Sequence, residues 1–79
     1  MGNYPNPFNP VTTIKFSIAE GEEGTLTIFN MKGQIVESKK FKHGRHNYVW
    51  NSQLNSSGIY FYTLTTDKYS STKKMIMLK

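Results

Sequence analysis

The chain has no cysteine and only five acidic residues among its 79 positions. Without cysteine, neither a disulfide framework nor a thiolate metal site can stabilise the fold, so a hydrophobic core must do so alone. Acid–base catalysis needs carboxylates or histidines held in different environments, but Glu20, Glu22 and Glu23 share one glycine-flanked turn where solvent keeps them alike. These absences argue against an enzyme.

Long apolar runs and helix-favouring residues are also scarce. The longest apolar run, from Met75 to Leu78, falls far below the roughly 20 residues that span a bilayer as a helix. There are one alanine and four leucines, whereas valine, isoleucine, threonine, phenylalanine, tyrosine and tryptophan together fill 28 positions. This composition favours strands over helices.

Sequence motifs of catalytic, phosphate-binding and metal-binding sites are absent. No Gly-x-Ser-x-Gly, phosphate-binding glycine loop or His-Glu-x-x-His occurs, and the glutamate turn lacks the spacing of a calcium loop. His43 and His46 point to opposite faces if they lie on a strand, which argues against a zinc pair. The triplet Asn55-Ser56-Ser57 matches a glycosylation site, but such triplets arise by chance in loops rich in serine and asparagine. We expect no catalytic residue, cofactor or metal.

The net charge of +5 permits a nucleic-acid binder, because eleven aromatic residues accompany it. However, the nine lysines are spread over the whole chain, there is one arginine, and no aromatic RNA-binding motif is present. A solvated surface with charged strand edges explains the lysines better. We therefore expect no nucleic-acid partner.

Alternating apolar and polar residues predict six strands separated by turns. The clearest runs from Val11 to Ile18, with Thr12, Ile14, Phe16 and Ile18 on the buried face. The others are expected at 25–30, 34–41, 45–50, 59–66 and 69–78. In this pattern Tyr48 and Trp50 face inward, Phe29 and Phe61 face outward, and lysines protect the edge strand 34–41.

The three prolines all lie in the segment 3–10, which is expected to be an extended ribbon anchored by Tyr4 and Phe8. Met1-Gly2 is interpreted as an added start before a native segment that begins near Asn3. The expected organisation is one domain, 3–79, with a proline-rich opening at 3–10 and a β-sandwich at 11–79.

The strand count predicts an all-β fold, an immunoglobulin-like antiparallel β-sandwich of six to seven strands. Tyr60 follows a turn at the start of a late strand, where its hydroxyl can bond upstream backbone as a tyrosine corner. A tyrosine that only fills the core explains the same position.

Five blocks in this order resemble the type A C-terminal sorting domain of the type IX secretion system, with similarity to the immunoglobulin-like domain of flagellar hook-capping proteins. They cover nearly the whole of 3–79 and are Asn3-Tyr4-Pro5-Asn6-Pro7-Phe8-Asn9-Pro10 with Thr12-Thr13-Ile14, Ile28-Phe29-Asn30 with Gly33-Gln34, His46 with Trp50, Gly58-Ile59-Tyr60-Phe61-Tyr62, and Lys73-Lys74-Met75 with Leu78-Lys79.

The resemblance implies a noncatalytic sorting domain that follows a covalently linked cargo domain. It implies recognition by outer-membrane secretion machinery, action of a sortase-like protease, and transit through the periplasm to the cell surface or beyond. The motif carries over to Tyr4, Pro5, Asn6, Pro7, Phe8, Gly58 and Tyr60. The expected partner-recognition residues are Lys73, Lys74, Met75, Ile76, Met77, Leu78 and Lys79.

The last predicted strand is apolar on both faces toward its end. We expect Met75 and Met77 to face outward, so that Lys73 to Lys79 presents a strand edge and an apolar strip to an acidic surface. A strand covered on both sides, with the proline-rich ribbon over it, fits the same pattern.

Two other functions remain compatible with the sequence. A carbohydrate-binding module needs a row of exposed aromatic side chains, whereas a structural spacer or cap needs assembly with itself or with a filament. For the sorting domain we expect a monomer.

Overall fold

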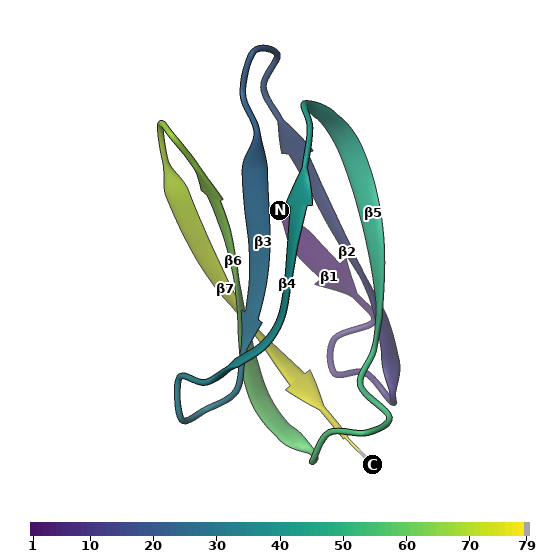
Figure 1. Ribbon diagram of the computed structural model, residues 1–79. Coiled ribbons are helices and arrows are strands. Elements are labelled where there is room, and N and C mark those ends of the chain that lie inside the picture. The colour runs from purple at the N-terminus through teal and green to yellow at the C-terminus, as the bar shows by residue number, and fades with distance from the viewer. Residues whose placement is uncertain (79) are drawn as a thin grey trace.

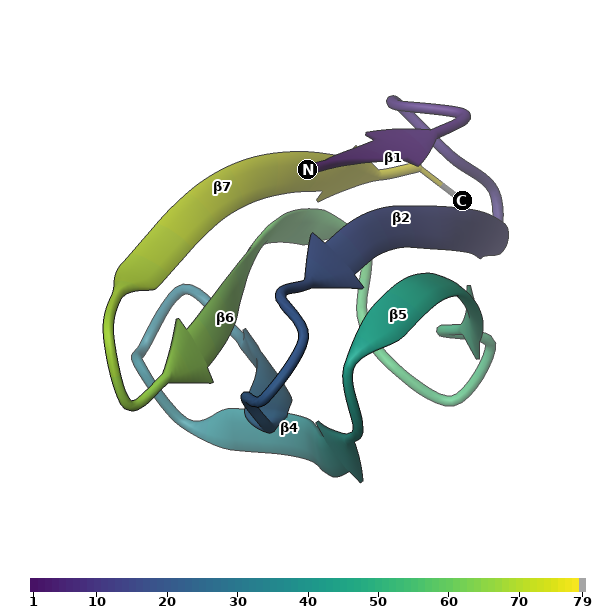
Figure 2. The same ribbon diagram turned by 90° about the horizontal axis from the view of Figure 1, so that it is seen from above.

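The computed structural model describes residues 1–78, and all regular structure in them is β-strand. Seven antiparallel strands form two sheets that face each other as a sandwich (Figures 1 and 2). The strands are β1 (Gly2–Tyr4), β2 (Val11–Ile18), β3 (Gly24–Phe29), β4 (Ile35–Phe41), β5 (Gly44–Asn51), β6 (Gly58–Thr66) and β7 (Ser70–Met77). The predicted all-β sandwich is confirmed. Within the described residues, no helix is long and apolar enough to cross a membrane.

One sheet has three strands in the order β1-β2-β5, and the other has four in the order β4-β3-β6-β7. The six predicted strands all form, with ends shifted by one residue or less. The seventh, β1, was not predicted, because the prolines pointed to an extended ribbon through 3–10. A strand forms at Gly2–Tyr4 because it ends before Pro5, so its pairing with Thr13 to Lys15 loses no backbone N–H to a proline.

The core lies between the sheets and follows the predicted alternation. Its buried apolar residues are Phe8, Ile14, Phe16, Ile18, Leu26, Ile28, Trp50, Tyr60, Tyr62, Leu64, Met75 and Met77. Val36, Phe41 and Tyr48 pack against this cluster from the edges. Trp50 is 4% exposed, as expected for an inward position.

The edge strand β4 carries a β-bulge, which changes the side of the sheet to which the residues before it point. Ile28 pairs with Glu37 but Phe29 pairs with Ile35, so Val36 is the extra residue. Val36 packs against the core while Ile35 faces outward beside Phe29. Glu37 lies on the inward side, where its carboxylate accepts a hydrogen bond from the Tyr48 hydroxyl. The bulge allows Ile35 to face outward while Glu37, two residues later, faces inward.

Buried hydroxyl groups hold the proline-rich segment against the sandwich. Thr12 donates to the carbonyl of Pro5 at 2.8 Å, and Ser52 donates to the carbonyl of Pro10 at 2.8 Å. Both hydroxyl side chains belong to fully buried residues, so each bond satisfies a group that would be costly to leave unpaired. The segment is therefore a fixed part of the fold.

Candidate functional site

The family-motif residues near the N-terminus lie along the last strand. The chain leaves the three-stranded sheet after Tyr4 and reaches β7 of the other sheet. Phe8 pairs with Met77 in a parallel bridge, accepting from the Leu78 amide at 2.8 Å and donating to the Ile76 carbonyl at 2.9 Å. Its ring is 2% exposed and lies 5.9 Å from the Trp50 ring, so Phe8 closes this side of the core.

Asn6 continues this contact with its side chain instead of its backbone. Its Oδ1 accepts the backbone N–H of Ile76 at 3.0 Å, and its Nδ2 donates to the carbonyl of Lys74 at 3.4 Å. Asn6 and Phe8 thus occupy the edge of β7 from Lys74 to Leu78. The prediction that this segment presents a free strand edge is wrong, because the proline-rich segment already pairs with it.

The second part of the motif lies at the other side of β7. Gly58 opens β6 with φ +145°, a left-handed conformation that glycine adopts without strain, and it pairs with Met77. Tyr60 pairs with Met75, and its hydroxyl donates to the carbonyl of Ser56 at 2.5 Å. The predicted tyrosine corner is present, and the ring also fills the core at 5% exposure.

The orientation of the last strand corrects the sequence prediction. Met75 and Met77 are 0% exposed, so they point into the core and not outward. Pairing with β6 causes this, because it places them opposite Tyr60 and Gly58 on the inward face. The outward positions are Lys74 and Ile76, followed by Leu78, which is 52% exposed.

Lys73 and Lys74 are both exposed but belong to opposite faces of β7. Lys73 pairs with Tyr62 on the inward-facing side at the sheet edge, while Lys74 pairs with Phe61 on the outer face. Lys79, the last residue of the predicted recognition segment, lies outside the described residues. The structure therefore brings together the segment 4–8, Gly58, Tyr60 and the end of β7.

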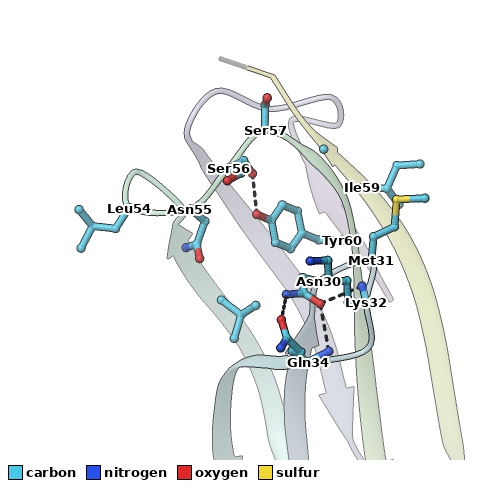
Figure 3. A pocket seen from close by; sticks show the side chains of 12 residues that line it. Asn30, Met31, Lys32, Gln34, Leu54, Asn55, Ser56, Ser57, Ile59 and Tyr60 are labelled. Atoms are coloured by element: carbon cyan, nitrogen blue, oxygen red, sulfur yellow. Dashed lines mark hydrogen bonds between the residues drawn. The ribbon is translucent and has the colours of Figure 1, made fainter.

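A cavity of about 390 Å³ opens next to these residues, between the β3–β4 turn and the loop before β6 (Figure 3). Asn30 shapes the turn: its Oδ1 accepts the backbone N–H groups of Lys32 and Gln34 at 2.9 and 3.0 Å, and its Nδ2 donates to Gln34 Oε1. Across the opening, Leu54 is fully exposed and points away from the Tyr60 ring. This cavity was not predicted, because residues of two loops that are distant in the sequence form most of it.

The ionisable groups of this region include the buried Tyr62. Burial raises the pKa of Tyr62 from its ordinary value of 10.0. Its hydroxyl donates to Asn3 Oδ1 at 3.1 Å, so it links the core to the N-terminal segment. Among residues 1–78, no group of three or more histidine, aspartate or glutamate side chains is placed to hold a metal ion.

Comparison with known proteins agrees with this arrangement. The chain matches the model of the secretion system C-terminal sorting domain family over residues 3–78. It belongs to this family. No curated protein and no solved structure gives a significant match. Nearly the whole chain is covered by the family match, including the motif segment 4–8 and all of β7.

Membership identifies the chain as a sorting signal domain of type IX secretion cargo. Such a domain is recognised by the secretion machinery as the C-terminal tail of a cargo that goes to the cell surface or outside. The family is a sorting signal and not a known enzyme. The core position of Trp50 and Tyr60 also removes two aromatic rings from any carbohydrate-stacking surface.

Proposed function

We propose that the machinery recognises this domain at the end of the sandwich where the motif residues meet, through outward side chains of the last strand. Lys74, Ile76 and Leu78 supply the contact, with Lys73 beside them at the sheet edge and Lys79 following. Met75 and Met77 act differently, because they hold the strand in place from the core side. What supports the proposal is this alternation: the inward Met75 and Met77 are buried, whereas the outward positions between and after them lie outside the core cluster.

We infer the partners from membership of the family. An outer-membrane translocon contacts the folded domain, and a sortase-like protease then separates it from a covalently linked N-terminal cargo after passage through the periplasm. In this proposal residues 3–79 act as one monomeric domain. The exposed lysines favour encounter with an acidic surface, because long-range attraction speeds association.

A reporter fusion tests the function in a bacterium that has a type IX system. With the whole chain fused at its C-terminus, the reporter should reach the cell surface. Removing residues 73–79 should abolish delivery, but this change also deletes Met75 and Met77 from the core. It therefore cannot by itself separate recognition from folding.

An outward double substitution separates the two effects. Ile76→Thr with Leu78→Thr keeps both methionines and the strand propensity, so the domain should still melt cooperatively while delivery falls. Ser70→Ala with Thr72→Ala provides the control at the other end of the same strand. If the Ile76 and Leu78 variant delivers the reporter as well as the native fusion does, the secretion machinery does not recognise the outward side chains of the last strand.

A further inference from the structure

The outer face of the four-stranded sheet has two chemically different halves. Outward side chains form rows across β4, β3, β6 and β7, as set by the strand register. The rows nearer the β6–β7 turn carry hydroxyl groups and one lysine: Thr25, Thr27, Ser38, Lys40, Thr63, Thr65, Ser70 and Thr72. The rows nearer the C-terminal end contain Phe29, Ile35, Ile59, Phe61 and Ile76, named here the apolar half, and one of these rows ends at Lys74.

The apolar half is continuous because its members are register partners. Phe29 lies between Ile35 on one side and Phe61 on the other, and Ile59 pairs with Ile76 one row further. Ile35 is 65% exposed, and the remaining four are partly exposed. Met31 and Ile59 both line the cavity, so its rim also carries apolar side chains (Figure 3).

Folding alone does not require these residues. The inward face of the sheet supplies the core, and an antiparallel sheet normally has a polar solvent face. The hydroxyl half shows that the same four strands pair without outward apolar groups. A contiguous apolar surface with polar surroundings is typical of an interaction site.

The charges around the apolar half indicate what kind of surface fits it. Lys32 and Lys74 flank it, and within residues 1–78 no outward strand position of this sheet carries a carboxylate. Asp67 lies in the β6–β7 turn, beyond the hydroxyl half. The glutamates of the β2–β3 turn lie at the opposite end of the sandwich (Figure 1), and Glu37 is turned inward to Tyr48. A second copy of this chain, which also carries +5, would bring lysines against lysines.

We propose that the apolar half docks on an apolar protein surface rimmed by carboxylates, which belongs to the secretion machinery. Recognition then extends over β3, β4 and β6 and is not confined to the last strand. The inference rests on the proposed function, since it names the surface through which the same machinery reads the domain. Residues far apart in the sequence contribute to it, so only a folded domain presents it.

The first test replaces the central aromatic pair. Phe29→Thr with Phe61→Thr extends the hydroxyl rows by one and keeps strand-favouring side chains. In the reporter fusion we expect surface delivery to fall at least tenfold while the purified domain stays folded. The matched control, Thr27→Ala with Thr63→Ala, changes the neighbouring register pair, lowers strand propensity and should leave delivery unchanged.

A charge reversal provides a test that does not depend on the packing of the two aromatic rings. Lys74→Glu places a carboxylate beside the apolar half, whereas Lys40→Glu makes the same change in the hydroxyl half. Only Lys74→Glu should reduce delivery, by about tenfold. If the fusion that carries Lys74→Glu reaches the surface at the native level, the proposed docking surface is overturned. This result holds even if the Phe29 and Phe61 variant is misfolded.

Three further outcomes decide between this inference and its alternatives. Sedimentation of the purified domain should show a monomer; a dimer that dissociates on Phe29→Thr with Phe61→Thr would make the face a self-interface and overturn the proposal. A native fusion that never reaches the surface would overturn the proposed function itself. Normal delivery by the native fusion and by the folded Phe29 and Phe61 variant would overturn only the docking surface, because neither residue belongs to the last strand.

Discussion

The side chain of Asn6 makes the hydrogen bonds to the edge of β7 that the backbone of a neighbouring strand would make beside Ile76. Its side-chain amide accepts the Ile76 N–H and donates to the Lys74 carbonyl, which are two groups that an adjoining backbone would satisfy. With Phe8 completing the edge as far as Leu78, the proline-rich segment covers the last strand where it is most apolar. Covering an edge in this way removes a template for unwanted pairing between chains.

Replacing this amide should loosen the edge of β7. We expect Asn6→Ala to lower the free energy of unfolding by about 1 kcal/mol and to speed amide hydrogen exchange at Ile76, because that N–H loses its acceptor. Urea denaturation and exchange measured by NMR check this. Asn9→Ala, at another exposed asparagine of the same segment, should change stability by less than about 0.5 kcal/mol.

The two buried methionines should prove essential for folding. Met75→Thr should destabilise the domain by about 2–5 kcal/mol, because it leaves a cavity and buries a hydroxyl group. A domain of this size has about 3–5 kcal/mol in total, so adding Met77→Thr should leave it largely unfolded at 25 °C. Circular dichroism on heating measures both. Cooperative melting of the double variant near the native temperature would contradict the inward orientation.

The tyrosine corner should contribute a modest amount. Tyr60→Phe keeps the buried ring but removes the hydroxyl that donates to the Ser56 carbonyl. We expect a loss of about 0.5–1.5 kcal/mol in urea denaturation, the usual contribution of one hydrogen bond. Tyr69→Phe makes the same chemical change at an exposed site and should cost less; equal losses would mean that the corner contributes nothing special.

Stability should fall in alkaline solution partly because of Tyr62. Burial raises its pKa in the folded state above the ordinary 10.0, so above pH 10 the unfolded chain loses this proton before the folded one does. The stabilisation is complete below pH 10 and is lost as the pH rises through the folded value. Melting temperatures from pH 8 to 11 should therefore decline less steeply for Tyr62→Phe than for the native domain. Parallel declines would show that Tyr62 titrates normally.

The strands were predictable because their signal is local. The alternation of apolar and polar residues along Val11–Ile18 and along Ile59–Thr66 predicts which side chains are buried, and the structure buries those side chains. The inward positions of Trp50 and Tyr60 follow from the same period of two. The strand β7 was predicted correctly, but the predicted orientation of Met75 and Met77 was wrong. Both faces of β7 are apolar near its end, so the alternation within the strand cannot show which face is buried.

By itself the sequence determined the fold class, the positions of six strands and the family motif, since these depend on residue type and short-range spacing. Tertiary structure alone decided the orientation of Met75 and Met77, because pairing with β6 sets the face of every residue in β7. It also decided that Asn6 and Phe8 occupy the β7 edge, and that Phe29, Ile35 and Phe61 meet in one row. These contacts join residues that are distant in the chain. Pairing over such distances leaves no pattern in the local sequence, so the contacts could not be predicted from it.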